Sequence, residues 1–231
     1  EAEEILRNAL EDLEGLLGPN SSDALECLSY LASVMRDLGK YDESETMNRH
    51  ALEVRDKVLG KDHPDTLTSA NNLALVLQYQ GKYDESETVN RRALEGWERI
   101  LGAGHPDTLI SVSHLAIVLR RQGKYSGSEA MNRRALEDRE EVLGPDHPDT
   151  LTSLNNLAIV LEYQGKHGES EKMKRRALEG REKVLGPDHP LTLASLNNLA
   201  IALEYQGKYG ESETMHRRAL EGREKVLGPD H

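Results

Sequence analysis

The 231-residue sequence has no phenylalanine, one tryptophan and one cysteine, Cys27. A single cysteine excludes an internal disulfide, so we expect a reducing, cytoplasmic setting. No run of apolar residues approaches the length of about 20 that a membrane-spanning helix needs, and no signal peptide is visible. Because large aromatic side chains are so scarce, the core has to be built from leucine and alanine, which favours closely packed helices.

The sequence also lacks an excess of basic residues. Its 29 lysines and arginines are outnumbered by 41 aspartates and glutamates, which gives a formal net charge of −12. Such a charge disfavours nonspecific binding to nucleic acid or to an anionic membrane. We therefore expect neither as a partner.

Catalytic signatures are missing as well. There is no HExxH motif, no glycine-rich phosphate-binding loop and no nucleophile motif, so we expect neither enzymatic activity nor a cofactor. The nearest candidate for a metal site is a regularly spaced row of histidines: His63, His105, His147, His189 and His231. Stacked helices lie roughly 8–10 Å apart, whereas two zinc-bound imidazoles each need a bond of about 2 Å. We interpret the row as structural, each histidine capping the N-terminus of a helix, and predict no metal ligand.

What the sequence does contain is a repeat of 42 residues. Residues 147–188 and 189–230 are identical at 36 of 42 positions. Five full repeats are predicted, numbered 1 to 5 in chain order, at 21–62, 63–104, 105–146, 147–188 and 189–230, and His231 would open a sixth. Residues 1–18 align with 43–60 and are interpreted as the second helix of a preceding, divergent repeat. A fixed period of this size predicts stacked repeats, and we expect the chain to be part of a longer protein.

Each repeat predicts two antiparallel helices, so the predicted fold class is all-α with about eleven helices. In repeat 2, apolar residues from Leu67 to Leu77 recur at helical spacing and mark the first helix. Pro64 suits the first turn of that helix, and Gly81 ends it, where a positive φ is needed. The second helix is expected from about residue 84 to residue 101. Its glutamates and arginines alternate at helical spacing, which predicts a solvent-exposed face with many ion pairs.

The repeats resemble the tetratricopeptide repeat (TPR) in its 42-residue form, through Leu73, Ala74, Gly81, Tyr83 and Ala93. They are similar to the repeats of kinesin light chains, and near-identical arrays of this kind also resemble the C-terminal sensor repeats of fungal NACHT or NB-ARC STAND receptors, which are NLR-like. The resemblance covers the whole chain and implies a right-handed superhelix, an α-solenoid, with a concave groove that binds a protein or peptide. The sequence departs from the family at four positions that usually hold an aromatic residue: Asn90, Asn132, Lys174 and His216.

The positions at which the repeats differ from one another indicate a binding surface. Counted from the first residue of each repeat, positions 5, 8, 11, 12 and 15 stay apolar, while positions 6, 9, 10, 13, 16 and 17 change. At about 100° per residue, the changing positions share one arc of the first helix, opposite the core stripe. The resemblance implies that this arc lines the groove. The recurring residue types favour a ligand surface, and free drift of an exposed face is the alternative.

The predicted partner-binding residues lie on this arc in all five repeats. They are Tyr30, Asn71, Asn72, Gln78, Tyr79, Ser113, His114, Ile117, Arg120, Arg121, Asn155, Asn156, Glu162, Tyr163, Asn197, Asn198, Glu204 and Tyr205. The same arc also contains Glu26, Ser29, Ser33, Arg36 and Asp37 in repeat 1, Thr68 and Leu75 in repeat 2, Ile110 in repeat 3, Thr152 in repeat 4 and Ala194 in repeat 5. Arg120 and Arg121 make repeat 3 positive, which predicts an acidic ligand there. The alternative is that these arginines pair with a neighbouring glutamate such as Glu162.

Three functions remain open at this stage. The leading interpretation is a non-enzymatic protein- or peptide-binding module, within the ligand-sensing region of a larger STAND or NLR-like receptor of innate immunity. The alternative is a cargo adaptor like the kinesin light chains, where first-helix asparagines hold an extended peptide. Asn72, Asn156 and Asn198 match those asparagines, whereas Tyr30 and His114 do not. The third interpretation is a structural or oligomerisation scaffold.

Two further features carry expectations. Trp97 stands where repeats 1, 3, 4 and 5 have arginine, and we interpret it as local packing rather than as an exposed contact. The terminal helices carry leucines and other apolar residues without a neighbouring repeat to cover them, which predicts self-association through the ends. These residues are Leu6, Leu10, Leu13 and Leu17 at the N-terminal end, and Met215, Leu220, Val226 and Leu227 at the C-terminal end.

Overall fold

The computed structural model describes residues 2–228, apart from the side chain of Leu227. Within this range the chain forms eleven α-helices and no strand, which confirms the all-α fold class. The last residues of repeat 5 and His231 lie outside the described part. The chain divides into two compact halves, Glu1–Gln122 and Gly123–His231, which are described separately below.

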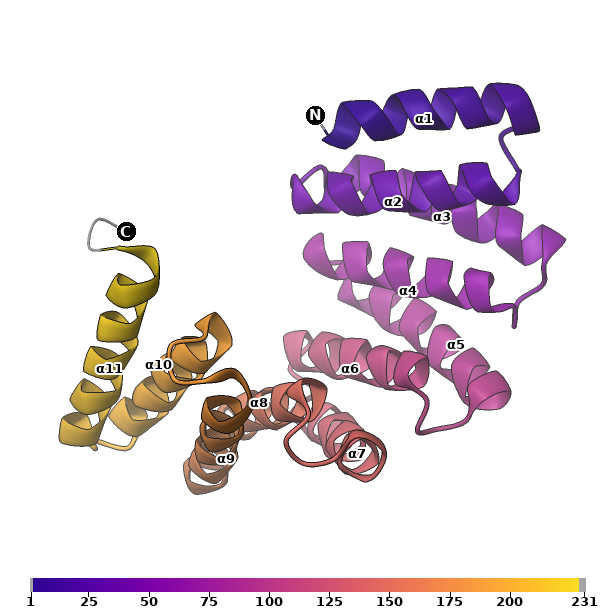
Figure 1. Ribbon diagram of the computed structural model, residues 1–231. Coiled ribbons are helices and arrows are strands. Elements are labelled where there is room, and N and C mark those ends of the chain that lie inside the picture. The colour runs from indigo at the N-terminus through magenta and orange to yellow at the C-terminus, as the bar shows by residue number, and fades with distance from the viewer. Residues whose placement is uncertain (1, 229–231) are drawn as a thin grey trace. The chain divides into compact units, whose positions relative to one another are not determined.

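The N-terminal half holds six helices. They are α1 (Ala2–Leu17), α2 (Ser22–Asp37), α3 (Tyr41–Val58), α4 (Pro64–Tyr79), α5 (Tyr83–Leu101) and α6 (Pro106–Arg121). Figure 1 shows α1, α2, α4 and α6 one after another in a stack, with α3 and α5 crossing behind α2 and α4. Each helix packs against its neighbours in the chain, and α4 also contacts the first helices α2 and α6.

The C-terminal half repeats this arrangement with five helices. They are α7 (Tyr125–Leu143), α8 (Pro148–Tyr163), α9 (His167–Leu185), α10 (Pro190–Tyr205) and α11 (Tyr209–Leu227). The first helices α4, α6, α8 and α10 therefore begin at intervals of 42 residues.

The histidine row caps the first helices. His63 lies at the N-cap of α4 in extended conformation, and its Nδ1 accepts a hydrogen bond from the backbone N–H of Asp65 at 3.2 Å. His105, His147 and His189 cap α6, α8 and α10 in the same way. A proline follows each of them at the first helical position, where its missing N–H costs nothing. The interpretation of these four histidines as caps is confirmed.

Glycines end the helices where the sequence predicts. Gly81 follows α4 with φ 78°, and Gly102 follows α5 with φ 85°. These values lie in the region that a residue with a Cβ atom avoids, so glycine is needed to reverse the chain between helices. The second helix α5 begins at Tyr83, one residue before the expected position.

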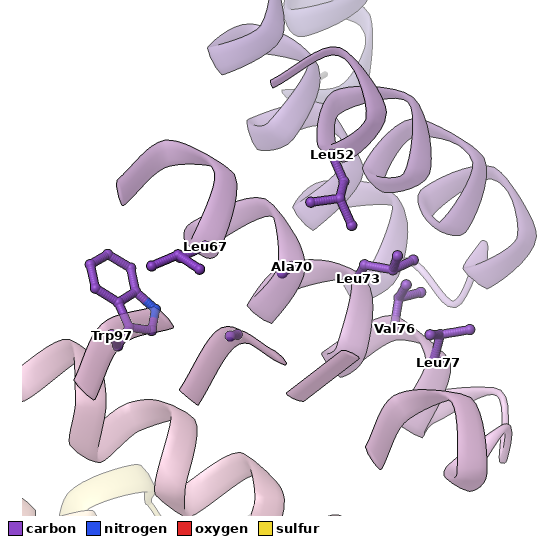
Figure 2. Packing of buried hydrophobic residues seen from close by; sticks show 8 residues of the cluster. Leu52, Leu67, Ala70, Leu73, Val76, Leu77 and Trp97 are labelled. Atoms are coloured by element: carbon purple, nitrogen blue, oxygen red, sulfur yellow. The ribbon is translucent and has the colours of Figure 1, made fainter. Parts of the chain in front are cut away.

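The core of repeat 2 is built mainly from leucine and alanine. Leu67, Leu73 and Leu77 from α4 are buried together with Trp97 from α5. Figure 2 shows the Trp97 indole beside Leu67 at the end of this cluster. Trp97 is only 3% exposed, so the interpretation of this residue as local packing is confirmed.

The second helices present the expected ion pairs to solvent. Arg49 pairs with Glu45 within α3 and reaches Glu85 on α5. Lys82 also pairs with Glu45, so α3 is tied to α5 by charges 36 or 37 residues apart. In the C-terminal half, the same arrangement links α7 to α9 and α9 to α11.

The terminal helices expose apolar side chains, as the sequence predicts. Leu17 of α1 is 55% exposed, and Leu220 and Val226 of α11 are 57% and 50% exposed. Leu6, Leu10 and Leu13 are of intermediate exposure, and Leu10 packs against the core of repeat 1. Met215 is likewise partly buried against the core of repeat 5. The side chain of Leu227 lies outside the described part. Self-association through these surfaces stays a prediction.

Candidate functional site

The predicted partner-binding residues all lie on the first helices, but with different exposure. The residues that are clearly exposed are Tyr30, Tyr79, Arg121, Tyr163, Glu204 and Tyr205. Those of intermediate exposure are Asn72, Gln78, Ser113, His114, Ile117, Arg120, Asn155, Asn156, Glu162, Asn197 and Asn198. Asn71 is buried. The predicted face is therefore a partly sheltered surface rather than a fully solvated one.

A cavity of about 250 Å³ opens on this face between α2 and α4. Six of its lining residues occupy the variable positions of the first helices: Glu26, Ser29, Tyr30, Ser33, Thr68 and Asn72. Three more complete the lining: Ser22, Arg55 and Asp65. The structure thus brings the variable positions of repeats 1 and 2 together around one hollow, which we name the α2–α4 cavity.

Hydroxyl groups in the α2–α4 cavity are oriented by the helix that carries them. Ser29 donates its hydroxyl hydrogen to the carbonyl of Leu25 at 2.8 Å, and Ser33 donates to the carbonyl of Ser29 at 3.1 Å. The Tyr30 hydroxyl bonds to Oε1 of Glu26 at 3.1 Å, and this bond to a carboxylate raises the pKa of Tyr30. The three hydroxyl oxygens consequently offer lone pairs to the cavity.

Arg55 lines the same cavity and was missed by the sequence analysis. It extends from α3, is 7% exposed, and donates from Nη1 to Ser69 Oγ at 2.7 Å and to Ser29 Oγ at 3.4 Å. Burial lowers the pKa of Arg55, while the charges of Asp65 and Glu26 act against that shift. A second cavity of about 280 Å³, on which His63 also borders, shares Ser22, Arg55 and Asp65 with the first.

The buried arginine recurs in other repeats with the same partner. Arg139 donates to Ser153 at 2.6 Å, and Arg181 donates to Ser195 at 2.6 Å, each 14 residues further along the chain. This spacing of arginine and serine is the signal in the sequence that could have identified Arg55. Arg181 makes two contacts that Arg55 lacks: its Nη1 donates to the carbonyl of Leu191 at 3.3 Å, and its Nη2 donates to Thr152 Oγ1 at 3.4 Å. In repeat 1, Glu26 occupies the position equivalent to Thr152.

In repeat 2, Trp97 stands in place of this arginine, and the serine of the following repeat forms its side-chain hydrogen bonds with a different residue. Ser111, the equivalent of Ser69, exchanges hydrogen bonds with the side-chain amide of Asn71, at 2.9 and 3.0 Å. This explains why Asn71 is buried although its position belongs to the variable arc. The sequence could not show it, because the partner of Asn71 comes from the following repeat.

The asparagines of the C-terminal half interact with each other. Asn198 donates from Nδ2 to Oδ1 of Asn155 at 3.2 Å, which connects α10 to α8. The carbonyl of Asn198 in turn accepts from Lys174 Nζ at 3.0 Å. The side chains of Asn155 and Asn198 thus face one another across neighbouring first helices, while the groove itself stays a prediction.

Polar residues at the family's aromatic position are accommodated in three ways. Asn90 is fully buried, and its amide atoms have no hydrogen-bond partner among the described residues. Asn132 donates to the carbonyl of Ser128 at 3.0 Å. Lys174 is 4% exposed by its side chain and pairs with Glu162 at 2.5 Å, whereas His216 bonds to Glu204 at 3.2 Å.

Repeat 3 has a partly buried histidine on the predicted surface. His114 lies in α6, and burial together with the charge of Arg36 lowers its pKa, so the neutral imidazole is favoured. Its Nδ1 atom is buried without a hydrogen-bond partner among the described residues. Nearby in the sequence, Arg121 is exposed and Arg120 is of intermediate exposure. An acidic ligand at these arginines stays a prediction.

Exposed tyrosines stand at the C-terminal ends of the first helices. Tyr79 stacks on Tyr41 with ring centroids 5.6 Å apart, and Tyr163 stacks on Tyr125 at 5.3 Å. Both pairs hold an exposed ring in a fixed orientation. Among residues 2–228, no group of histidine, cysteine, aspartate and glutamate side chains is placed to hold a metal ion, and no helix is long and apolar enough to cross a membrane.

Comparison with solved structures places the fold among repeat arrays. The nearly identical TPR-like repeats described for a kinesin light chain of Podosopora anserina are 23% identical, with 88% of this chain and 96% of that chain covered and a TM-score of 0.78. BtubC (BKLC) of P. vanneervenii is 18% identical, with 98% and 91% covered and a TM-score of 0.83. The apo form of RapI is 16% identical, with 95% and 60% covered and a TM-score of 0.72.

The sequence itself identifies the family. No curated protein matches it, but the tetratricopeptide repeat family matches at residues 27–94, 66–140, 111–183 and 161–225. These matches cover most of the chain. Tetratricopeptide repeats are generally non-enzymatic scaffolds that bind protein or peptide partners. The chain belongs to the tetratricopeptide repeat family.

Proposed function

We propose that the chain is a peptide- or protein-binding module whose ligand lies along the first helices, with the α2–α4 cavity as one of its contact sites. The observation that carries this proposal is the lining of the cavity. Six variable positions, taken from two different repeats, surround one hollow of about 250 Å³. Ligand sites are typically concave and use a few convergent polar groups, as here.

The chemistry of the surface suits an extended peptide. Asn72, on the cavity wall, and Asn156, on α8, offer amide groups that can donate to and accept from a peptide backbone. Exposed tyrosines such as Tyr30 and Tyr79 supply contact area at a low cost in side-chain entropy. Constant core positions beside variable surface positions support a surface selected for its ligand.

We further propose that this module senses a ligand within a larger STAND or NLR-like signalling receptor. The support is the near identity of repeats 4 and 5, which agree at 36 of 42 positions and indicate recent duplication or exchange of whole repeats. A cargo adaptor of the kinesin light chain type is the alternative, favoured by the asparagines at 72, 156 and 198. An NTPase motif encoded next to the repeats would support the receptor, and coiled-coil heptads would support the adaptor.

A displayed library of random peptides tests the binding proposal. Peptides selected on the purified chain are expected to lose at least about tenfold in affinity, or 1.4 kcal/mol, when Tyr30→Ala and Asn72→Ala are combined. The matched control is Tyr209→Ala, because Tyr209 is 71% exposed on the second helix α11. Selected peptides that bind the double variant and the native chain equally would place the ligand elsewhere and refute the proposed site.

A further inference from the structure

We propose that the α2–α4 cavity receives a single basic side chain, a lysine or arginine of the bound segment. This inference rests on the proposed function and names what repeat 1 selects in the ligand.

The charges around the cavity favour a cation. Glu26 and Asp65 carry two negative charges, and Arg55 carries one positive charge, which leaves the lining with a net charge of −1. The charge of −12 on the whole chain adds to the attraction at long range.

Arg55 is held largely by a contact outside the cavity. Its short hydrogen bond, 2.7 Å from Nη1, goes to Ser69, which is not among the residues that line the cavity. Since Arg55 as a whole is only 7% exposed, we place it at the floor of the cavity that it lines. One of the two carboxylates offsets its charge, and the other remains for the ligand.

Three hydroxyl groups of the lining need a hydrogen-bond donor from the ligand. Ser29 and Ser33 use their own hydrogens on helix carbonyls, and the Tyr30 hydroxyl is engaged with Glu26. What these groups present to an incoming ligand is therefore acceptor oxygen. Lysine and arginine side chains carry donors and no acceptor, so they match these three oxygens and the carboxylates beside them, whereas a carboxylate offers only acceptors.

Repeat 1 alone combines the two substitutions that create this site. Position 6 is Glu26 here but Thr68, Ile110, Thr152 and Ala194 in the other repeats. Position 13 is Ser33 here but Leu75, Ile117, Ile159 and Ile201 elsewhere. The first change adds a carboxylate, and the second replaces a large side chain with a small one and leaves space. A volume of about 250 Å³ lies below the range of about 300–1,000 Å³ typical of drug-sized ligands, and suits one side chain.

The other repeats supply the variants for the test. Glu26→Thr and Ser33→Ile each introduce a residue that other repeats already hold at the same position, so folding should be retained, which circular dichroism checks. The matched control is Glu53→Thr, which removes the same charge from an exposed position on α3. Each protein is probed with a degenerate peptide library in which one position at a time is fixed as lysine, arginine, glutamate or leucine.

We expect the native chain and the Glu53→Thr control to prefer lysine or arginine over leucine at one peptide position. Glu26→Thr and Ser33→Ile should each reduce that preference by about tenfold and leave the preferences at other positions unchanged. Peptides that bind without any basic preference, with a preference for glutamate, or with a basic preference that survives Glu26→Thr would overturn this inference alone. If the native chain retained no more peptide from the library than the Tyr30→Ala, Asn72→Ala variant does, the proposed function would be overturned and this inference with it.

Discussion

At the scale of single residues, one position on the second helix changes from repeat to repeat together with the residue that it contacts on the first helix. Lys174 in repeat 4 and His216 in repeat 5 each face a glutamate, at positions 162 and 204. Repeat 2 has Asn90 and Gln78 at the same two places. An ionised side chain in a sheltered site needs an opposite charge, so lysine is tolerated only where the first helix provides glutamate.

We therefore predict that Lys174→Met destabilises the chain by about 1–3 kcal/mol, because Glu162 loses its partner while it is still mostly sheltered. The double variant Lys174→Asn, Glu162→Gln reproduces the neutral pair of repeat 2 and should recover most of that loss. Urea unfolding measures both. If the double variant were no more stable than Lys174→Met, the pairing would not explain the tolerance of lysine at this position.

At the scale of elements, three of the helix pairs approach each other closely because of a glycine. A Cβ atom built on Gly180 of α9 would lie 2.5 Å from Cδ2 of Leu151 on α8, and Gly96 and Gly222 meet the equivalent leucines at 2.4 Å. Repeats 1 and 3 have Val54 and Asp138 at this position, so the crossing of the two helices has to be adjusted there.

Gly180→Ala is expected to destabilise the chain by about 1–3 kcal/mol, because Leu151 has to move within a packed core. Gly168→Ala in the same helix is the control. Nothing lies within 4 Å of its added Cβ, and the loss of chain entropy in the unfolded state should raise stability by about 0.4–1 kcal/mol. Thermal unfolding distinguishes a loss of stability in Gly180→Ala from a gain in Gly168→Ala. Equal changes in the two variants would show that the close approach of the helices has no energetic importance.

Helices and their ends could be predicted because their signals are local. Pro64 and Gly81 fix the bounds of α4 through backbone geometry, and the apolar spacing between them fixes the buried face. The site was only partly predictable, because its composition depends on how helices from different repeats meet. Arg55 belongs to a second helix and reaches the cavity from behind, while Asn71 turns inward to a serine of the next repeat. Neither contact follows from the periodicity of one helix.

At the scale of the whole molecule, each of the two halves contains a regular series of ion pairs that join its second helices. An individual surface ion pair contributes only about 0–1 kcal/mol to stability. These pairs therefore stabilise the chain mainly through their number and through the few that are partly buried. Glu129 is such a member. Hydrogen bonds from Lys166, and further ones from Arg133 and Gln164, outweigh burial and lower the pKa of Glu129 to about 2. For Glu45, burial acts to raise the pKa, but bonds from Lys82, Arg49 and Gln80 prevail and lower it to about 2.

These two carboxylates predict the acid sensitivity of the array. A group whose pKa is lower in the folded state stabilises the fold above its unfolded pKa, here 4.5, and that contribution is lost as the pH falls toward 2. The unfolding free energy should therefore decrease between about pH 5 and pH 2. Glu129→Gln should be less stable than the native chain at pH 7, and the difference should shrink as the pH approaches 2. The exposed Glu137→Gln on α7 is the control. Urea unfolding at several pH values measures the slopes, and parallel curves for Glu129→Gln and the native chain would contradict the assignment of acid sensitivity to these ion pairs.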